Sequence, residues 1–361
     1  MNILACAVGF GLGPNGKLCS IINSNKQYKW YACGDKLDLS IYQENPFIDV
    51  CWSKNEKFLE RFIKKYNIKC AVNVLDPDLA IFFKKIGIKV IYIDSLSFMW
   101  TKADIIPYDV DYYCAQKYPE YEMNPALKDV KNFIWINPIT AGKFEEKNKN
   151  GIVVNFGGLH SPFGEGKEYF EVVMKALLPT LKGKEVVITG GENVMKLTKE
   201  LFPNFTSITY SHEEFLKHVS NSELFITSPG LTTIYETCMM NINTIIMPPQ
   251  NLSQFYNIET AEKIYKNVKI LRWNNKNLSW EKIKLFQDKP EEETVKYIYE
   301  QIYKLANNDE EIMKFKEYVL NKLKDDFIIN EVKTFEENGT QQIFNILNEI
   351  MEESNYENIG N

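Results

Sequence analysis

The stretch Ser228-Pro-Gly-Leu-Thr-Thr-Ile-Tyr-Glu236 predicts a buried strand over 224–227 that breaks and opens directly into a helix. Free backbone N–H groups and the positive end of the dipole at such a helix start favour an anion. A carboxylate one turn further along, at Glu236, can accept hydrogen bonds from a diol such as a ribose. Phosphate next to ribose indicates a nucleotide. The residues that we expect to contact it here are Gly230, Leu231, Thr232, Thr233 and Glu236.

Length and composition narrow the class of protein. The 361 residues suggest two domains of about 150–200 residues each. A formal net charge of -6 argues against nucleic-acid binding, which needs a basic face. No apolar stretch approaches the roughly 18–20 residues that span a bilayer, and the N-terminus lacks a signal-peptide pattern. Seven dispersed cysteines fit reduced thiols, so we expect a cytoplasmic protein without an integral membrane segment.

Short apolar runs alternate with helical patterns along most of the chain, which predicts βαβ units and two doubly wound α/β domains. We expect an N-terminal Rossmann-like domain over 1–140, a C-terminal Rossmann-like domain over 151–290 and a helical segment over 291–354 that packs on both. Strands are expected at 3–8, 28–33, 70–75, 89–94, 112–115, 152–156, 185–189, 208–210, 224–227 and 244–247. The main helices are expected at 58–66, 79–86, 169–181, 194–201, 212–219, 232–240, 292–305, 309–324 and 340–353.

Glycine-rich turns follow the first predicted strand of each domain. The run Gly9-Phe-Gly-Leu-Gly13-Pro-Asn-Gly16-Lys17 precedes a helix expected from about Lys17, and it nearly contains the dinucleotide fingerprint. The acid expected for an NAD ribose, Asp35, falls too late, and a ligand-free tight turn remains an alternative. We predict that Gly11, Gly13, Asn15 and Lys17 lie in a loop that approaches substrate or diphosphate. Gly157 and Gly158 are predicted to reach a phosphate through their amides in the same way.

The stretch 210–236 and the later run Asn251-Leu-Ser-Gln254-Phe-Tyr-Asn257 together resemble the donor site of GT-B glycosyltransferases. The likeness is to the enzymes that add N-acetylglucosamine to lipid-linked muropeptide in cell-wall synthesis. It implies two facing Rossmann-like domains with a helical C-terminal cap, the domain over 1–140 for the acceptor and the domain over 151–290 for the nucleotide-sugar donor, with a UDP-sugar as substrate. In that family the Glu of the helix binds the ribose and the Q-x-x-N residues hold the donor sugar. The resemblance therefore adds Ser211, Gln254 and Asn257 to the expected donor site.

Two departures from that family leave the identity of the acceptor undetermined. The family's N-terminal glycine loop carries a histidine where this chain has Pro14-Asn15, and Asn251 replaces the Asp that opens the sugar-binding segment. We therefore expect a small soluble acceptor, such as a nucleobase or a sugar, rather than the muropeptide lipid. Four aromatic residues could stack on a planar acceptor such as a nucleobase, or they could belong to the core: Phe10, Trp52, Phe98 and Trp100.

A sugar transfer needs a base for the acceptor and a stabiliser for the departing diphosphate. The first 159 residues contain no histidine, so the candidates for acid–base work are Asp94 and Asp76, at the ends of predicted strands, and His160. We favour Asp94 as the base, because Ser95, Ser97 and Trp100 give it a polar and aromatic setting. Asp76 is alternatively only a helix N-cap before Pro77. We expect a metal-independent, inverting transferase without a cofactor. The alternatives are a nucleotide-sugar hydrolase or epimerase of the same fold, and a non-catalytic nucleotide-sugar-binding protein.

Overall fold

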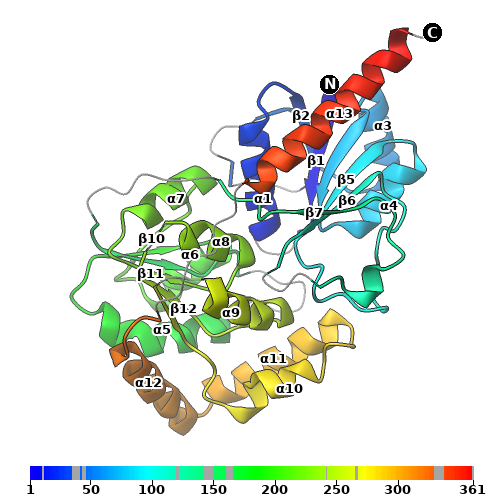
Figure 1. Cartoon of the computed structure of the whole chain (residues 1–361). Coiled ribbons are helices and arrows are strands. Elements are labelled where there is room, and N and C mark those ends of the chain that lie inside the picture. Colours follow the sequence, from blue (N-terminus) through cyan, green and yellow to red (C-terminus); the bar gives the residue numbers. More distant parts are fainter. Residues whose placement is uncertain are drawn as a thin grey trace. The chain divides into compact units, whose positions relative to one another are not determined.

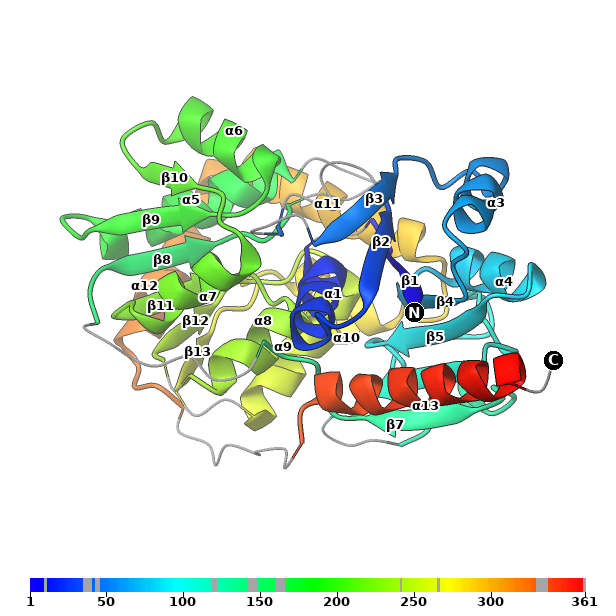
Figure 2. The same ribbon diagram turned by 90° about the horizontal axis from the view of Figure 1, so that it is seen from above.

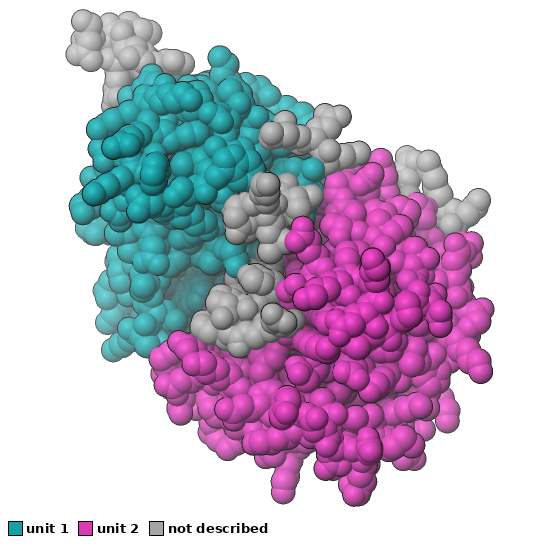
Figure 3. Space-filling view, turned by 180° about the vertical axis from the view of Figure 1, so that it is seen from behind, with its two compact units in different colours: residues 1–9, 14–142, 334–361 teal, residues 10–13, 143–333 magenta. Residues whose placement is uncertain are grey.

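The computed structural model describes residues 1–9, 12–34, 41–42, 46–118, 122–141, 149–159, 166–240, 242–264, 267–328 and 337–359. By their contacts the residues divide into two compact units, each with its own parallel sheet (Figures 1 and 3). The first unit comprises residues 1–9, 14–142 and 334–361, and the second comprises residues 10–13 and 143–333. The chain thus leaves its first unit, builds the second, and returns to the first.

The first unit is built on a seven-stranded parallel sheet with the order β3-β2-β1-β4-β5-β6-β7. Its strands are β1 (Asn2–Ala7), β2 (Lys29–Cys33), β3 (Phe47–Cys51), β4 (Cys70–Val74), β5 (Lys89–Asp94), β6 (Tyr112–Gln116) and β7 (Phe133–Ile136). The central strands are runs of Val, Ile, Ala and Cys because both faces of a parallel sheet are buried. The strand order reverses between β1 and β4, which are adjacent in the sheet.

Helices cover both faces of this sheet. On one face, α1 (Gly13–Ser24) and α13 (Gly339–Ile359) contribute apolar residues to one core; α13 runs along the sheet (Figure 2). On the other face, α3 (Glu56–Lys65) and α4 (Pro77–Lys85) form a second core with the opposite sides of the same strands. A single turn of 3-10 helix, η1 (Pro125–Leu127), precedes β7. The C-terminal helix is therefore an integral part of the N-terminal sheet's packing.

The second unit contains a six-stranded parallel sheet with the order β10-β9-β8-β11-β12-β13. Its strands are β8 (Ile152–Asn155), β9 (Val186–Thr189), β10 (Thr206–Ile208), β11 (Leu224–Thr227), β12 (Thr244–Ile246) and β13 (Val268–Ile270). Its helices are α5 (Lys167–Leu181), α6 (Glu192–Leu201), α7 (His212–Ser220), α8 (Leu231–Cys238), α9 (Leu252–Ile264), α10 (Trp280–Lys284), α11 (Glu291–Ala306) and α12 (Asp309–Lys324), with a 3-10 turn, η2 (Lys276–Leu278). Both α11 and α12 pack on α5. The strand order reverses between β8 and β11.

Two Rossmann-like α/β units confirm the predicted fold class, but some elements differ from the expectation. The sequence patterns did not predict β3, β7 and β13, which all lie at the edges of their sheets. A charged residue interrupts the apolar pattern of β3 (Asp49) and of β13 (Lys269), whereas β7 is a continuous apolar run that the prediction missed. Helix α1 begins at Gly13 with Pro14 in its first turn, four residues before the expected start, and α13 continues to Ile359. Within the described ranges, no helix is both long and apolar enough to cross a membrane.

Candidate functional site

The carboxyl ends of the strands in the second unit bring the predicted donor residues to one edge of the sheet. In the strand register Asn155 pairs with Thr189 on one side and Thr227 on the other, and Thr227 pairs with Ile246. The segments after these residues therefore leave the sheet at the same level. Because ligands of doubly wound sheets bind where the strand order reverses, the gap between β8 and β11 is the expected position for one.

The turn after β8 is shaped by a buried asparagine. Asn155 donates to the Thr227 hydroxyl at 3.1 Å and accepts from the Gly157 N–H at 2.9 Å. Gly157 has φ +64, a left-handed conformation that a side chain disfavours. Leu159 shares this region with φ 43, where a residue with a side chain is strained. The Asn155 amide thus holds the turn in a shape that the backbone alone would not choose.

A second glycine turn supports the first. The Gly191 N–H donates to the Gly157 carbonyl at 2.9 Å, and a Cβ at Gly190 would lie 2.6 Å from the same oxygen. A Cβ at Gly191 would lie 3.0 Å from the Gly158 carbonyl oxygen. The two turns therefore touch backbone to backbone. Only glycine permits so close an approach at this edge of the sheet.

Replacement of Gly157 by alanine tests whether the left-handed turn matters for binding. We expect Gly157→Ala to lower the free energy of unfolding of the second unit by about 1–2 kcal/mol, because φ is positive there. Gly183 is the matched control, since it also has positive φ (+74) and a Cβ there would meet nothing within 4 Å. Both variants should lose similar stability in urea denaturation, but only Gly157→Ala should weaken UDP binding in calorimetry. Equal UDP affinities for the two variants would contradict a ligand role for this turn.

Helix α8 starts at Leu231, with Gly230 as its N-cap and no side chain capping it. The Thr232 hydroxyl donates to the carbonyl of Gly13, which is grouped with the second unit, at 3.2 Å. The Thr233 hydroxyl makes no hydrogen bond to a described residue and is half-buried. An uncapped helix start next to an open hydroxyl has the donors that a phosphate needs.

The carboxylate of Glu236, 2% exposed, lies inside the second turn of α8. The Nε2 atom of His212, the first residue of α7, is 2.9 Å from its Oε1. The contact has ion-pair distance but not the direction of a hydrogen bond, so Oε1 accepts none from the described part of the chain. A buried acceptor without a donor costs about 1–3 kcal/mol unless a ligand satisfies it.

Asn257 on α9 provides a second buried acceptor of this kind. Its Nδ2 donates to the Pro229 carbonyl at 2.8 Å, which ties α9 to the turn before α8. Its Oδ1 is buried and accepts no hydrogen bond from any described residue. Glu236 and Asn257 thus each have one buried oxygen that accepts no hydrogen bond from the described residues. Hydroxyl groups of a ligand are donors that can satisfy both oxygens.

The other two residues of the expected donor site have partners within the chain. The Ser211 hydroxyl donates to the Glu214 carboxylate at 2.8 Å and accepts from the Glu214 N–H, as a capping box for α7. The Gln254 Oε1 accepts from the Gln250 N–H at 3.0 Å, and its Nε2 has no described partner. Asn251 caps α9 by accepting from Ser253 and the Gln254 N–H. Ser211 positions a helix here, whereas Gln254 keeps one amide group available.

In the first unit, Asp94 is enclosed by the protein. Its carboxylate accepts from the Leu96 N–H at 2.8 Å, the Trp100 indole N–H at 2.8 Å and the Tyr113 hydroxyl at 2.6 Å. Burial raises its pKa to about 6, against the lowering effect of those three donors. With 0% exposure and three donors already bound, Asp94 holds the loop after β5 in place. Its geometry is that of a structural anchor.

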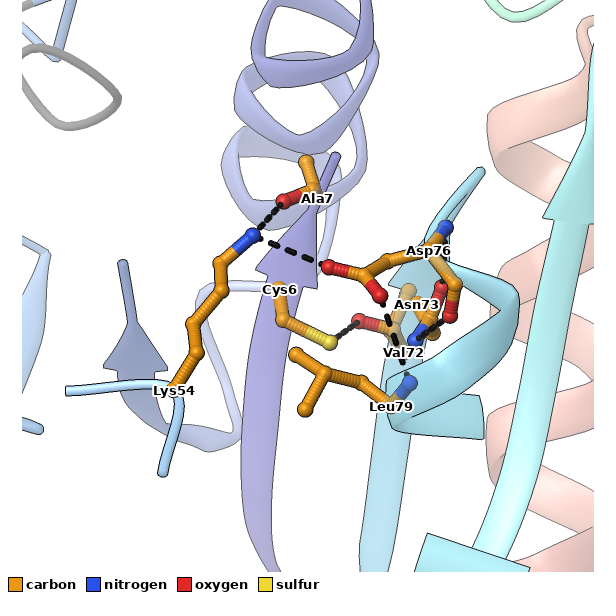
Figure 4. A network of polar contacts seen from close by, with 7 residues as sticks. All are labelled: Cys6, Ala7, Lys54, Val72, Asn73, Asp76 and Leu79. Carbon is orange, nitrogen blue, oxygen red and sulfur yellow. Dashed lines mark hydrogen bonds and ion pairs between the residues drawn. The ribbon is translucent and has the colours of Figure 1, made fainter. Parts of the chain in front are cut away.

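Asp76 has a more open position at the end of β4. Its Oδ1 accepts from the Leu79 N–H as the N-cap of α4, and its Oδ2 is 2.9 Å from the Nζ of Lys54 (Figure 4). Asp76 is therefore the N-cap of α4, and its side chain is also 13% exposed, so the carboxylate can be reached from solvent. Lys54 was not among the sequence-derived candidates.

The structure describes Asn15 and Lys17 among the remaining candidates. Asn15 and Lys17 lie within α1 and are each 2% exposed, so the expectation of an exposed loop at these two residues was wrong. The physical reason is that α1 starts at Gly13 and buries this turn. Gly11 and His160 lie outside the described residues.

No protein-family model matches the sequence, and no curated protein sequence matches it. Solved structures do match it. The UDP-GlcNAc 2-epimerase of Methanocaldococcus jannaschii, in complex with UDP-GlcNAc and UDP, is 14% identical over 85% of this chain and 100% of its own, with a TM-score of 0.51. The spinosyn rhamnosyltransferase SpnG, complexed with thymidine diphosphate, is 10% identical over 96% and 100%, also with a TM-score of 0.51. The chain has the GT-B fold.

A crystal structure of MurG from Acinetobacter baumannii also matches, at 13% identity over 96% of this chain and 99% of that chain. Its TM-score of 0.48 is too low to support a conclusion about this chain. At identities of 10–14% the likeness to the epimerase and to SpnG establishes the GT-B fold and does not transfer an activity.

Two residues of this GT-B chain acquire a site position only in the folded structure. His212 follows the Ser211 cap in the sequence and has the position of an ordinary first-turn residue of a helix. The neighbouring sequence does not indicate its contact with Glu236. Lys54 follows an edge strand that the pattern did not predict, so its place beside Asp76 had no sequence signal. Among the described residues, no group of three or more His, Cys, Asp or Glu side chains is placed to hold a metal ion.

Proposed function

We propose that the chain is a glycosyltransferase that binds a UDP-sugar in its second unit and transfers the sugar to a small soluble acceptor. One observation carries the proposal: Glu236 Oε1 and Asn257 Oδ1 are buried acceptors that no described residue satisfies. A ribose diol and a sugar hydroxyl are donors of matching chemistry. The diphosphate would bind at the start of α8 and at the Gly157-Gly158 turn, where backbone N–H groups and the helix dipole favour negative charge.

In this proposal each part of the site has a defined role. Glu236 binds the ribose, and Thr233 and the first-turn amides of α8 bind the diphosphate. Gln254 donates through its open Nε2 to the sugar, while Asn257 accepts from it. His212 supports Glu236 from α7 at 2.9 Å. No cofactor beyond the nucleotide-sugar substrate is needed for this set of contacts.

The transfer itself is a displacement at the anomeric carbon. The acceptor oxygen forms a bond to this carbon as the bond to the diphosphate oxygen breaks, and UDP departs with the bonding electron pair. The acceptor proton passes to a base, and a single displacement inverts the configuration.

We propose Asp76 for this base ahead of Asp94, because the Asp94 carboxylate is fully buried and already accepts three hydrogen bonds. His160 is the third candidate. The helix start offsets the charge on UDP without a metal ion.

A donor panel tests the proposal. At a concentration about 100 times the Kd, a UDP-sugar should stabilise the protein by about 2.7 kcal/mol, a rise in Tm of about 2–4 °C. NAD(P)H should give no rise. Incubation with a metabolite extract and UDP-sugar, followed by mass spectrometry, should then show a glycosylated product together with acceptor-dependent UDP release. A Tm that does not respond to any UDP-sugar would refute the proposal.

A nucleotide-sugar epimerase or hydrolase is the second candidate, because the epimerase structure matches this chain as well as the rhamnosyltransferase does. Water or a proton transfer would then replace the acceptor. Incubation with a UDP-sugar alone distinguishes the cases. Free UDP and sugar without acceptor indicate a hydrolase, and a stereoisomeric UDP-sugar indicates an epimerase. Binding without turnover in any mixture indicates a nucleotide-sugar-binding protein.

A further inference from the structure

The strand order of the first unit reverses between β1 and β4, as it does between β8 and β11 in the second. A doubly wound sheet binds its ligands in the crevice outside the carboxyl ends of such strands. The donor site of the proposed function uses this position in the second unit only. In the first unit the same position is occupied by the ammonium of Lys54 and the carboxylate of Asp76 (Figure 4).

The Lys54 side chain reaches this point from the segment after β3. Its Nζ donates to the Ala7 carbonyl, at the last residue of β1, at 2.8 Å and to Asp76 Oδ2 at 2.9 Å. The third N–H of the ammonium has no partner among the described residues. Burial alone would lower the pKa of Lys54, but the charge and hydrogen bond of Asp76 outweigh it and raise the pKa. The group therefore carries its positive charge and one unused donor.

The carboxylate is held rigidly by its own backbone. The buried side chain of Asn73 donates to the Asp76 carbonyl at 2.9 Å and accepts from the Asp76 N–H at 3.0 Å. Between them, Leu75 adopts a left-handed conformation with φ 60, which a branched side chain disfavours. An N-cap alone requires neither the strain nor Lys54. Strain at a position that surrounding contacts hold so firmly is typical of functional sites.

An exposed aromatic residue stands two positions before Lys54 in the chain. Trp52 follows β3 at the same end of the sheet and is 59% exposed. Two of the other aromatics that the sequence suggested for stacking are engaged elsewhere: Trp100 donates to Asp94, and Phe98 stacks on Tyr118 with ring centroids 4.0 Å apart. Phe10 lies outside the described residues. Trp52 is thus an aromatic face available at this edge.

An ammonium donor, a carboxylate acceptor and an exposed indole match the chemistry of a sugar ring. Neighbouring hydroxyls can each accept from an ammonium and donate to a carboxylate, and the C–H face of the ring packs on an aromatic side chain. A nucleobase offers a planar ring for Trp52 but no pair of hydroxyls for Lys54 and Asp76.

We propose that Lys54, Asp76 and Trp52 form a carbohydrate-binding site in the first unit, with Lys54 and Asp76 bound to two adjacent hydroxyls. This site rests on the proposed function in one respect only, because it would receive the acceptor of the transferase. The site chemistry then identifies that acceptor as a sugar. Its binding chemistry does not require a nucleotide.

Saturation-transfer NMR on the intact protein, without any nucleotide, tests the site directly. The probes are glucose, galactose, mannose, rhamnose and N-acetylglucosamine, with the free nucleobases uracil and adenine as comparison compounds, since these carry no pair of hydroxyls. We expect at least one free sugar to give saturation transfer, and Lys54→Met to weaken its binding by about tenfold or more, the loss of one charged hydrogen bond. Lys64→Met, which removes an exposed ammonium paired with Glu60 on α3, should leave the signal unchanged.

The second variant guards against loss of folding. Asp76→Asn keeps an oxygen for the N-cap bond to Leu79, since Asn caps helices well, but removes the charge that holds Lys54. It should weaken sugar binding while the melting temperature stays near that of the wild type. Absence of transfer from all five sugars, a signal that persists in both Lys54→Met and Asp76→Asn, or binding of the nucleobases alone would overturn the site.

UDP binding separates this site from the proposed donor site. We expect Lys54→Met to bind UDP as the wild type does, because Lys54 is not among the donor-site residues. A protein that binds the sugars but not UDP-sugars would retain this site and refute the proposed transferase. Binding of UDP-sugars without binding of any free sugar would refute the carbohydrate site and leave the proposed donor site standing.

Discussion

Substitution of Glu236 by glutamine is expected to weaken UDP binding by about 10- to 100-fold, the loss of one or two charge-assisted hydrogen bonds to ribose hydroxyls. The carboxylate is 2% exposed, and its Oε1 accepts no hydrogen bond from a described residue. Glutamine has nearly the same shape but carries no charge. Its amide offers only one acceptor in place of two. UDP is the probe, since it contains the ribose and the diphosphate, and isothermal titration calorimetry measures the change in Kd.

The same substitution should leave the fold intact, which makes the result interpretable. Glutamine keeps the shape of the side chain and can keep an oxygen towards the His212 Nε2 atom, which is 2.9 Å from Oε1, so Glu236→Gln should unfold at a urea concentration close to that of the wild type. Glu213→Gln is the matched control, because Glu213 lies on α7 next to His212 but faces solvent and pairs with Lys217. If Glu236→Gln bound UDP as tightly as Glu213→Gln does, Glu236 would not be a ligand of the nucleotide.

Asp94 gives the second large effect, on stability rather than on binding. Its folded-state pKa of about 6 lies above the value of about 3.9 for an unfolded Asp. The stability that it contributes is therefore complete below about pH 4 and is lost as the pH rises through about 6. Relative to Asp94→Asn, which does not titrate, the wild-type advantage should shrink by about 3 kcal/mol between pH 4 and pH 8.

Hydrogen exchange of β5 and β6 amides, measured in both proteins across this range, reports the change within the first unit. At pH 4 the variant should be the less stable by about 1–3 kcal/mol, because its amide leaves the Trp100 indole N–H without an acceptor. Asp109→Asn is the control, since Asp109 is exposed and pairs only with Lys131 among the described residues. A stability difference that does not change with pH would contradict the raised pKa. If the pH–rate profile of the enzyme showed a transition near pH 6 that Asp94→Asn abolished, Asp94 would instead be the catalytic base.

Much of the fold could be predicted because the controlling interactions are local. The runs that became β1, β4, β5 and β11 are mostly apolar, with Asn73 as the one polar residue inside β4, and a mostly apolar run is what a strand buried on both faces needs. The glycine turns at Gly157 and Gly190 follow such strands directly. Edge strands could not be predicted in the same way: β3 contains Asp49, whose carboxylate bonds to Tyr66, so its pattern is not apolar. What makes it a strand is pairing with β2.

The helix that begins after Ser228-Pro-Gly230 was determined by the sequence alone. Proline and glycine end the strand, the threonines open the helix, and Glu236 follows one turn later because a helix repeats every 3.6 residues. The tertiary structure decided which side chains complete the site. It placed His212 against Glu236 and Lys54 against Asp76, and it enclosed Asp94. These contacts join elements that are distant in sequence, and they depend on strand order and burial, which no local pattern encodes.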